Sequence, residues 1–110
     1  MCSGKFYYDL AEGRAARRRT DVALVRLEQL YPLRAPDVLG ALSRYPSTAR
    51  VVWAQEEPRN MGAWGFVRES LGEAVRGLEA VARAASASPA SGSATRHRLV
   101  QQALVEEALG

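Results

Sequence analysis

Residues 49–66 read ARVVWAQEEPRNMGAWGF, and this stretch decides the fold. Its apolar run at residues 51–54 contains β-branched and aromatic side chains, which predicts a strand covered on both faces, as in a parallel sheet. The polar residues 55–57 then end the strand. Pro58 has no backbone N–H and cannot extend a central strand, so the chain is expected to leave the sheet there.

The residues that follow this turn predict a helix. Asn60 is a suitable N-cap. The apolar side chains after it recur at helical spacing: Met61, Ala63, Trp64, Val67 and Leu71. In open α/β sheets, ligands and partners bind outside the carboxyl ends of the strands, which is where Glu56 and Glu57 are expected to lie.

The rest of the chain repeats this alternation. A helix is predicted from Phe6 to about Arg18, a second buried strand over residues 22–27, and another helix from Pro36 until Pro46 ends it. Such alternation predicts an α/β fold: a small, mainly parallel sheet with right-handed crossovers and helices on both faces.

The C-terminal third is less uniform. Residues 73–85 have a helix-forming composition, which favours continuation of the preceding helix; the alternative is a fourth strand within residues 78–83. Residues 86–93 form a loop of small residues. A last helix over residues 94–109 is predicted to bury Leu99, Val100, Ala103, Leu104 and Ala108.

Composition predicts one domain over residues 1–110, with ordinary apolar (47%) and charged (25%) fractions. No apolar run approaches the ~20 residues of a membrane span, so no membrane partner is expected. The net charge of +3 comes without a basic face interleaved with aromatics, so no nucleic-acid partner is expected either. The single cysteine, Cys2, cannot form an internal disulfide, which is compatible with a reducing cytoplasm.

The candidate site residues favour an interface over chemistry. Glu56 and Glu57 are adjacent on a strand and point to opposite faces, so they cannot easily serve one reacting atom. The only histidine, His97, is expected on an exposed helical turn, and no Cys/His cluster forms a metal site. No catalytic, cofactor-binding or metal-binding residue is therefore predicted. Trp64 could instead anchor a neighbouring domain.

The last helix carries its charges in the reverse of the order that its dipole favours. Basic residues stand in its first turn and acidic residues in its last. One hypothesis is an anion site, in which a phosphate or carboxylate is held by Arg83, Ser91, Gly92, Ser93 and Arg96. The alternative is a set of salt bridges to acidic residues of another domain.

Four blocks of sequence, in order, resemble a known family. They are CSGKFYYDL (2–10), VALVRLEQLYP (22–32), VVWAQEEPRNMGAW (51–64), and SASPASGS (86–93) followed by QQALVEEALG (101–110). Together they resemble the C-terminal domain of the thiamine-diphosphate-dependent, decarboxylating component of the 2-oxoglutarate dehydrogenase complex.

The resemblance implies a three-layer α/β/α sandwich like the transketolase C-terminal domain. The implied parent enzyme acts in the tricarboxylic acid cycle of the bacterial cytoplasm, where it oxidatively decarboxylates 2-oxoglutarate and passes a succinyl group to the dihydrolipoyl succinyltransferase component. Thiamine diphosphate and magnesium are implied for the parent's preceding domains, and no cofactor for this chain. The chain would support the homodimer and pack on the catalytic domains of the same enzyme. Matching positions assign that role to Glu56, Glu57, Asn60, Met61, Gly62 and Trp64.

Two departures from the family pattern stand out. Residues 1–5 read as the end of a strand and its turn, so the first strand is predicted to be truncated, its neighbour unpaired, and the chain a piece of something longer. Residues 80–84 keep only the arginine of the family's Tyr-x-Gly-Arg-Pro pattern. The alternatives are a free-standing regulatory module that binds a nucleotide or acyl-CoA at residues 91–98, or the equivalent domain of a related 2-oxoacid dehydrogenase or transketolase.

Overall fold

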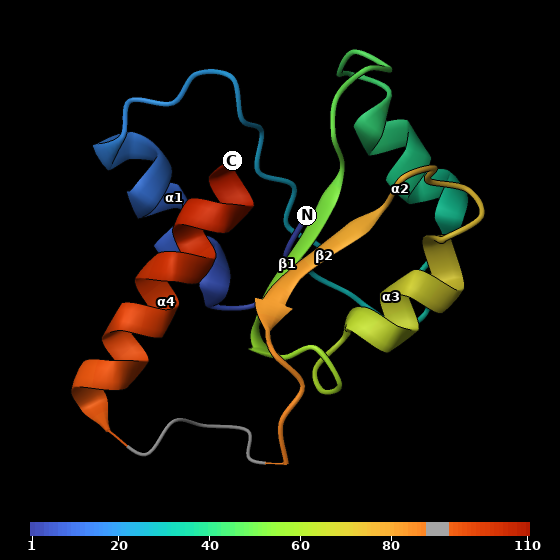
Figure 1. Ribbon diagram of the computed structural model, residues 1–110. Helices are drawn as coiled ribbons and strands as arrows, with labels where there is room; N and C mark the ends of the chain where they lie inside the picture. The colour runs from blue at the N-terminus through green and yellow to red at the C-terminus, as the bar shows by residue number, and fades with distance from the viewer. Residues whose placement is uncertain (88–92) are drawn as a thin grey trace.

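The computed structural model describes residues 1–87 and 93–110. Strands β1 and β2 pair in parallel at the centre, with Trp53 opposite Ala80 and Ala54 opposite Val81 (Figure 1). The elements in chain order are α1 (Phe6–Ala16), α2 (Ala35–Leu42), β1 (Val52–Pro58), α3 (Trp64–Leu71), β2 (Glu79–Arg83) and α4 (Ala94–Leu109).

Helices cover both faces of this sheet, α1 and α4 on one side and α2 and α3 on the other (Figure 1). Because successive strand residues point to opposite faces, Ala54 packs with α1 and α4, whereas Trp53 packs with α2 and α3. Each face has its own buried apolar cluster, and the predicted three-layer α/β/α sandwich is confirmed.

The first two residues lie inside the sheet. The Met1 ammonium donates to Val52 O (2.6 Å), and Ala54 N donates to Met1 O (2.8 Å). On the opposite side, Cys2 N donates to Val25 O (3.0 Å) and forms a parallel bridge with Arg26. Residues 1–2 therefore lie between β1 and residues 25–27 and pair with both.

Two predicted elements differ in extent. The buried strand expected over residues 22–27 is reduced to the bridge at Arg26 and is half-buried at most positions, since only residues 1–2 lie beside it. Strand β1 continues past its predicted end to Pro58, which pairs with Arg83 after an irregularity in the register. Arg59 N, and not Pro58, supplies the donor to Arg83 O there (2.8 Å).

The helix favoured over residues 73–85 is wrong, and the alternative strand is confirmed as β2. Gly77, at φ +73°, makes the turn that leads into β2. Ala80 and Val81 then enter the two apolar clusters, one on each face. Burial on both faces of the sheet outweighs the local preference for helix.

The last helix has its predicted bounds but a different buried face. Leu104 is buried as expected, whereas Leu99 is 62% exposed and Ala103 is also exposed. Val105 and Leu109 are buried in their place, because the face in contact with α1 and the sheet is centred on the second half of the helix.

Candidate functional site

A buried amide organises the carboxyl end of β1. The side chain of Gln55 is 3% exposed, and its Oε1 accepts hydrogen bonds from Trp53 Nε1 (2.9 Å) and Trp64 N (2.9 Å). Trp64, expected to anchor a neighbouring domain, is only 8% exposed and packs in the cluster beside α3. One acceptor atom therefore joins the strand to the start of the helix after it.

The other end of the same amide holds the loop between them. Gln55 Nε2 donates to Pro58 O (3.0 Å) and Met61 O (2.8 Å), and more weakly to Glu57 O (3.3 Å). Gly62 has φ +64°, and a Cβ there would come within 3.1 Å of Glu57. The loop thus closes tightly around the Gln55 side chain and presents Glu57, Met61 and Gly62 together.

Asn60 does not act as the predicted N-cap, because α3 begins later, at Trp64, after Ala63 and without a side-chain cap. Its Nδ2 donates to Ser86 O (2.9 Å), and its Oδ1 accepts from Ser86 N (3.0 Å). Asn60 therefore ties the loop after β1 to the segment after β2, so the two strand ends form one surface.

Glu56 joins the strand to the helices of the opposite face. Its Oε1 accepts from Lys5 Nζ (2.8 Å) and Gln101 Nε2 (3.0 Å), and Gln101 also donates to Asp9 Oδ2 (2.9 Å). The hydrogen bond to Glu56 raises the pKa of Lys5. Glu56 thus contacts Lys5, just before α1, and Gln101 of α4, whereas Glu57 lies over Gly62, so the adjacent carboxylates are separated.

The residues of the anion hypothesis are only partly described. Arg83 Nε donates to Glu56 O (3.0 Å), so this side chain turns towards β1. Ser93 caps α4, since its Oγ accepts from Arg96 N (3.1 Å), and the Arg96 residue is exposed. Ser91 and Gly92 lie outside the described residues. The anion site stays a prediction.

Sequence reasoning missed two features of this region. The sequence pattern places Gln55 at the end of a strand, although an amide next to a buried tryptophan is a signal for a satisfied polar core. The sequence indicates Phe66 as a core or interface residue but not its pairing with Tyr31; the two residues are 38% and 81% exposed, and their rings lie 6.3 Å apart beside the start of α3. An exposed aromatic pair of this kind is typical of an interface.

Fold and site together define a small three-layer α/β domain whose strand ends carry a preorganised polar loop. A family model described as 2-oxoglutarate dehydrogenase C-terminal matches residues 1–109. The chain therefore belongs to the 2-oxoglutarate dehydrogenase C-terminal family, as the four sequence blocks predict.

Curated relatives support the same assignment. The 2-oxoglutarate dehydrogenase E1 component of Cupriavidus necator is 46% identical over 98% of this chain, and that of Haemophilus influenzae is 47% identical over 99%. The E1 component of Rickettsia felis is 42% identical over 100% of the chain. In each case the chain spans 12% of the relative's length.

Two kinds of feature are absent from residues 1–87 and 93–110. No helix there is long and apolar enough to cross a membrane. No group of three or more His, Cys, Asp or Glu side chains that could hold a metal ion occurs in those ranges.

Proposed function

We propose that this chain serves as the C-terminal region of a 2-oxoglutarate dehydrogenase E1 component and acts by packing. Its surface at the strand ends would contact the remaining regions of the enzyme and support the homodimer. The observation that carries the proposal is the match of residues 1–109 to the C-terminal family, in a chain that spans 12% of its E1 relatives.

The parent enzyme in this proposal decarboxylates 2-oxoglutarate oxidatively in the tricarboxylic acid cycle of the bacterial cytoplasm. It uses thiamine diphosphate and magnesium, and it passes the succinyl group to the dihydrolipoyl succinyltransferase component. The cofactor chemistry belongs to the rest of E1. The three relatives, at 42–47% identity, favour this parent over a transketolase.

The proposed interface is the loop that Gln55 holds. Glu57 and Met61 are half-buried, so their side chains are partly accessible to a partner. Asn60 is exposed, and its side chain holds the loop against Ser86. The hydrogen bonds of Gln55 fix this backbone before binding, which lowers the entropy lost on association. Glu56 supports the same edge from the other face through Lys5 and Gln101.

The test is to mix the chain with a C. necator E1 that lacks the region matching this chain. Light scattering would measure association, and product formation would measure 2-oxoglutarate turnover. We expect a stoichiometric complex and recovered turnover. If folded chain neither associates nor restores turnover, the proposal is wrong.

A matched pair of charge reversals locates the interface. Glu57→Lys reverses the charge of one side chain in the loop, and Glu69→Lys makes the same charge reversal on the exposed surface of α3. We expect Glu57→Lys to weaken association by about tenfold or more and Glu69→Lys to change it less than about twofold. Equal effects of the two substitutions would contradict the assignment of the loop as the contact surface.

A further inference from the structure

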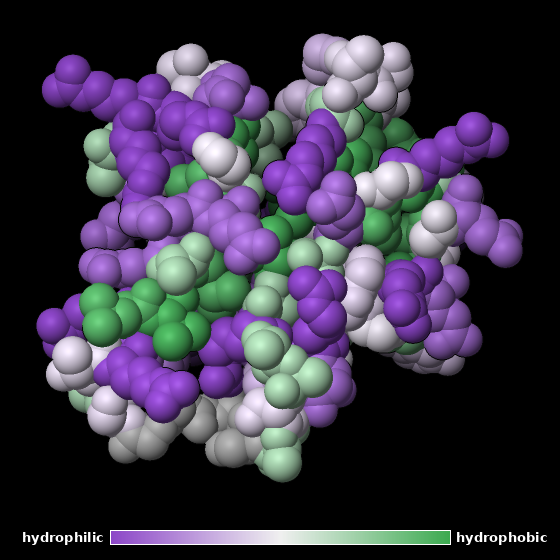
Figure 2. Space-filling view, in the orientation of Figure 1, coloured by the Kyte–Doolittle hydropathy of each residue, from purple (hydrophilic) through white to green (hydrophobic). Residues whose placement is uncertain are grey.

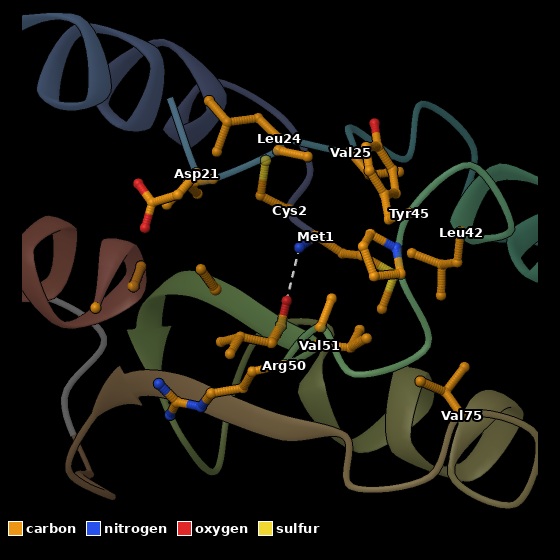
Figure 3. A pocket seen from close by; sticks show the side chains of 18 of the residues that line it. Met1, Cys2, Asp21, Leu24, Val25, Leu42, Tyr45, Arg50, Val51 and Val75 are labelled. Atoms are coloured by element: carbon orange, nitrogen blue, oxygen red, sulfur yellow. Dashed lines mark hydrogen bonds between the residues drawn. The ribbon is translucent and has the colours of Figure 1, made fainter. Parts of the chain in front are cut away.

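Strand β2 forms an open edge of the sheet within the described residues. Strand β1 has neighbours on both sides, because Met1 N donates to Val52 O on the side away from β2 (Figure 3). Strand β2 pairs only with β1, and it lies in front of β1 in Figure 1, so that view looks onto its outer edge. The space-filling view in the same orientation shows mildly hydrophobic surface along this line, between hydrophilic side chains (Figure 2).

Alternate residues of β2 direct their backbone groups out of the sheet. Glu79 N donates to Val51 O (3.3 Å), so Glu79 and every second residue after it face β1. The N–H and C=O of one strand residue point to the same side, and the side alternates along the strand. The backbone groups of Ala80 and Ala82 therefore face outward. Such groups on an edge strand are a template for a strand of another chain.

The side chain of Arg59 covers this edge. Arg59 N donates to Arg83 O (2.8 Å), which places its backbone at the end of β2, and Arg59 Nη2 donates to Ala80 O (3.2 Å). The side chain therefore runs back along the outer side of β2, from Arg83 to Ala80. The hydrogen bond occupies an outward carbonyl with a charged group. The Arg59 residue is exposed, so the cation keeps contact with water.

The loop after β1 holds Arg59 in this position. Gln55 Nε2 donates to Pro58 O (3.0 Å) and to Met61 O (2.8 Å), so the backbone is fixed on both sides of Arg59. The side chain of Asn60, the next residue, bonds to the segment after β2. Because the backbone is already ordered, the contact of Arg59 with the edge costs little further conformational entropy.

Without this cover, the β2 segment has the properties of a strand that can associate. Residues 78–85 read LEAVARAA, with no proline and no net charge. The charge of Glu79 is paired with Arg50 of the same chain (3.0 Å). Proline and charge are two of the means by which edge strands avoid pairing with other chains. On this edge the protection comes from Arg59, outside the strand.

We infer that Arg59 guards the β2 edge and keeps this chain from pairing edge to edge with a second copy. About a two-fold axis, β2 of one copy would meet β2 of the other in antiparallel order. Each edge carries its own Arg59, so pairing would bring two guanidinium groups together and remove them from water. Like charges at close range and lost hydration both oppose this contact. The inference goes beyond the proposed function, since it concerns self-association of the chain and not its place in E1.

The test removes the charge and the donor of Arg59 but keeps an unbranched side chain, as Arg59→Met. Arg68→Met is the matched control, because Arg68 is exposed on α3. Sedimentation equilibrium at neutral pH would measure self-association. We expect the dissociation constant of Arg59→Met to be about tenfold or more below that of the unsubstituted chain, and that of Arg68→Met to stay within about twofold. Arg59→Lys keeps the charge and should behave as the unsubstituted chain does.

Amide hydrogen exchange, followed by NMR, locates the contact. In the unsubstituted chain, Ala82 N–H faces outward and should exchange about tenfold or more faster than Val81 N–H, which pairs within the sheet. In associated Arg59→Met we expect exchange at Ala82 to slow by about tenfold or more. The measurement on the unsubstituted chain needs no variant, so it tests the open edge even if Arg59→Met does not fold.

Several outcomes would overturn the inference. These are Arg59→Met as monomeric as the unsubstituted chain, equal association of Arg59→Met with Arg68→Met or Arg59→Lys, and association that leaves exchange at Ala82 unchanged. Protection of Ala82 in the unsubstituted monomer equal to that of Val81 would also do so, because the edge would then be paired already. All measurements use this chain alone, so their failure leaves the E1 mixing experiment unaffected, and the reverse also holds.

Discussion

At the scale of single residues, the Gln55 side chain has the largest structural role. It is buried and shares hydrogen bonds with the indole of Trp53, the backbone N of Trp64 and three loop carbonyls. Removing it would leave buried donors and acceptors unpaired, which costs more than the bonds themselves contribute.

Gln55→Leu is expected to lower the free energy of unfolding by about 2–4 kcal/mol, because several buried polar groups lose their partner together. Gln29→Leu is the matched control: its amide is exposed and donates only to Tyr31 O, so a change within about 0.5 kcal/mol is expected. Urea unfolding measures both. Equal losses would show that Gln55 does not hold the loop.

Asp21 forms an ion pair with the nearby Arg19 side chain. Two hydrogen bonds from Arg19 (2.7 and 2.8 Å) hold the pKa of Asp21 at about 2. Because the folded pKa is depressed, the stabilisation is present above the ordinary value of 3.8 and is lost as the pH falls towards 2. Arg19→Ala is expected to return the pKa to near 3.8 in an NMR titration, and the exposed, distant Arg44→Ala to leave it at about 2. An unchanged pKa in Arg19→Ala would exclude this cause.

Residue patterns predicted the separation of Glu56 and Glu57, because strand geometry alone decides it. They did not predict the roles of Gln55 or Asn60. Each of these amides bonds to groups whose positions depend on the folded loop, and in the case of Asn60 on Ser86, which is 26 positions away. The order of neighbouring residues in the sequence does not indicate hydrogen-bond partners that only the folded chain brings together.

At the scale of elements, helices α1 and α4 make a close contact at Gly13. A Cβ at this position would overlap Val105 of α4, whereas a Cβ at Gly40 in α2 would meet nothing. We therefore expect Gly13→Ala to destabilise the chain by about 1–3 kcal/mol through overpacking. Gly40→Ala is expected to stabilise it by about 0.5–1 kcal/mol, because alanine favours the helix. Thermal unfolding compares the two.

A double-mutant cycle identifies the contact partner. Val105→Ala removes the side chain that the new methyl group would meet, so Gly13→Ala should cost less in that background. We expect a coupling energy of about 0.5–3 kcal/mol. Strict additivity would place the cause of any destabilisation elsewhere.

The bounds of α4 were predictable because Ser93 is a good N-cap and the chain after it has helical composition. The buried face of α4 was not predictable. Leu99 and Val105 are both apolar, and only the position of α1 decides which of them is buried. The alanine-rich composition of the β2 segment favours a helix, so the sequence indicated a strand there only as the alternative. Its pairing with β1 depends on contacts 27 positions apart, as between Val52 and Glu79.

At the scale of the whole molecule, the buried Met1 ammonium makes stability depend on pH. Burial lowers its folded pKa below the ordinary value of 8.0, although the Cys2 thiolate opposes this shift. Between the lowered pKa and pH 8.0 the unfolded chain binds more protons, so the free energy of unfolding should rise with pH across that window. Below the folded pKa both states carry the proton, so this contribution no longer changes with pH.

Urea unfolding at several pH values below 8.0 measures this dependence. The N-terminally acetylated chain is the control, because its amide can still donate to Val52 O but carries no titrating charge. We expect the slope to be reduced in the acetylated chain. Identical slopes would mean that other groups cause the dependence.

The three layers were predictable because the alternation of strands and helices leaves few arrangements open. The family was indicated by the resemblance of four sequence blocks. The interior position of residues 1–2 in the sheet could not be predicted. It depends on hydrogen bonds to two distant segments, one near Val25 and one near Val52. A sheet's spatial order is set by such distant pairings.

The central claim is that this chain can take the place of an E1 C-terminal region. The most direct measurement is a chimera in which this chain replaces the matching region of C. necator E1, assayed for 2-oxoglutarate turnover and dimer mass. We expect a dimer that turns over 2-oxoglutarate within about tenfold of the parent rate. A folded, dimeric chimera without turnover, or a folded chimera that remains monomeric, would contradict it.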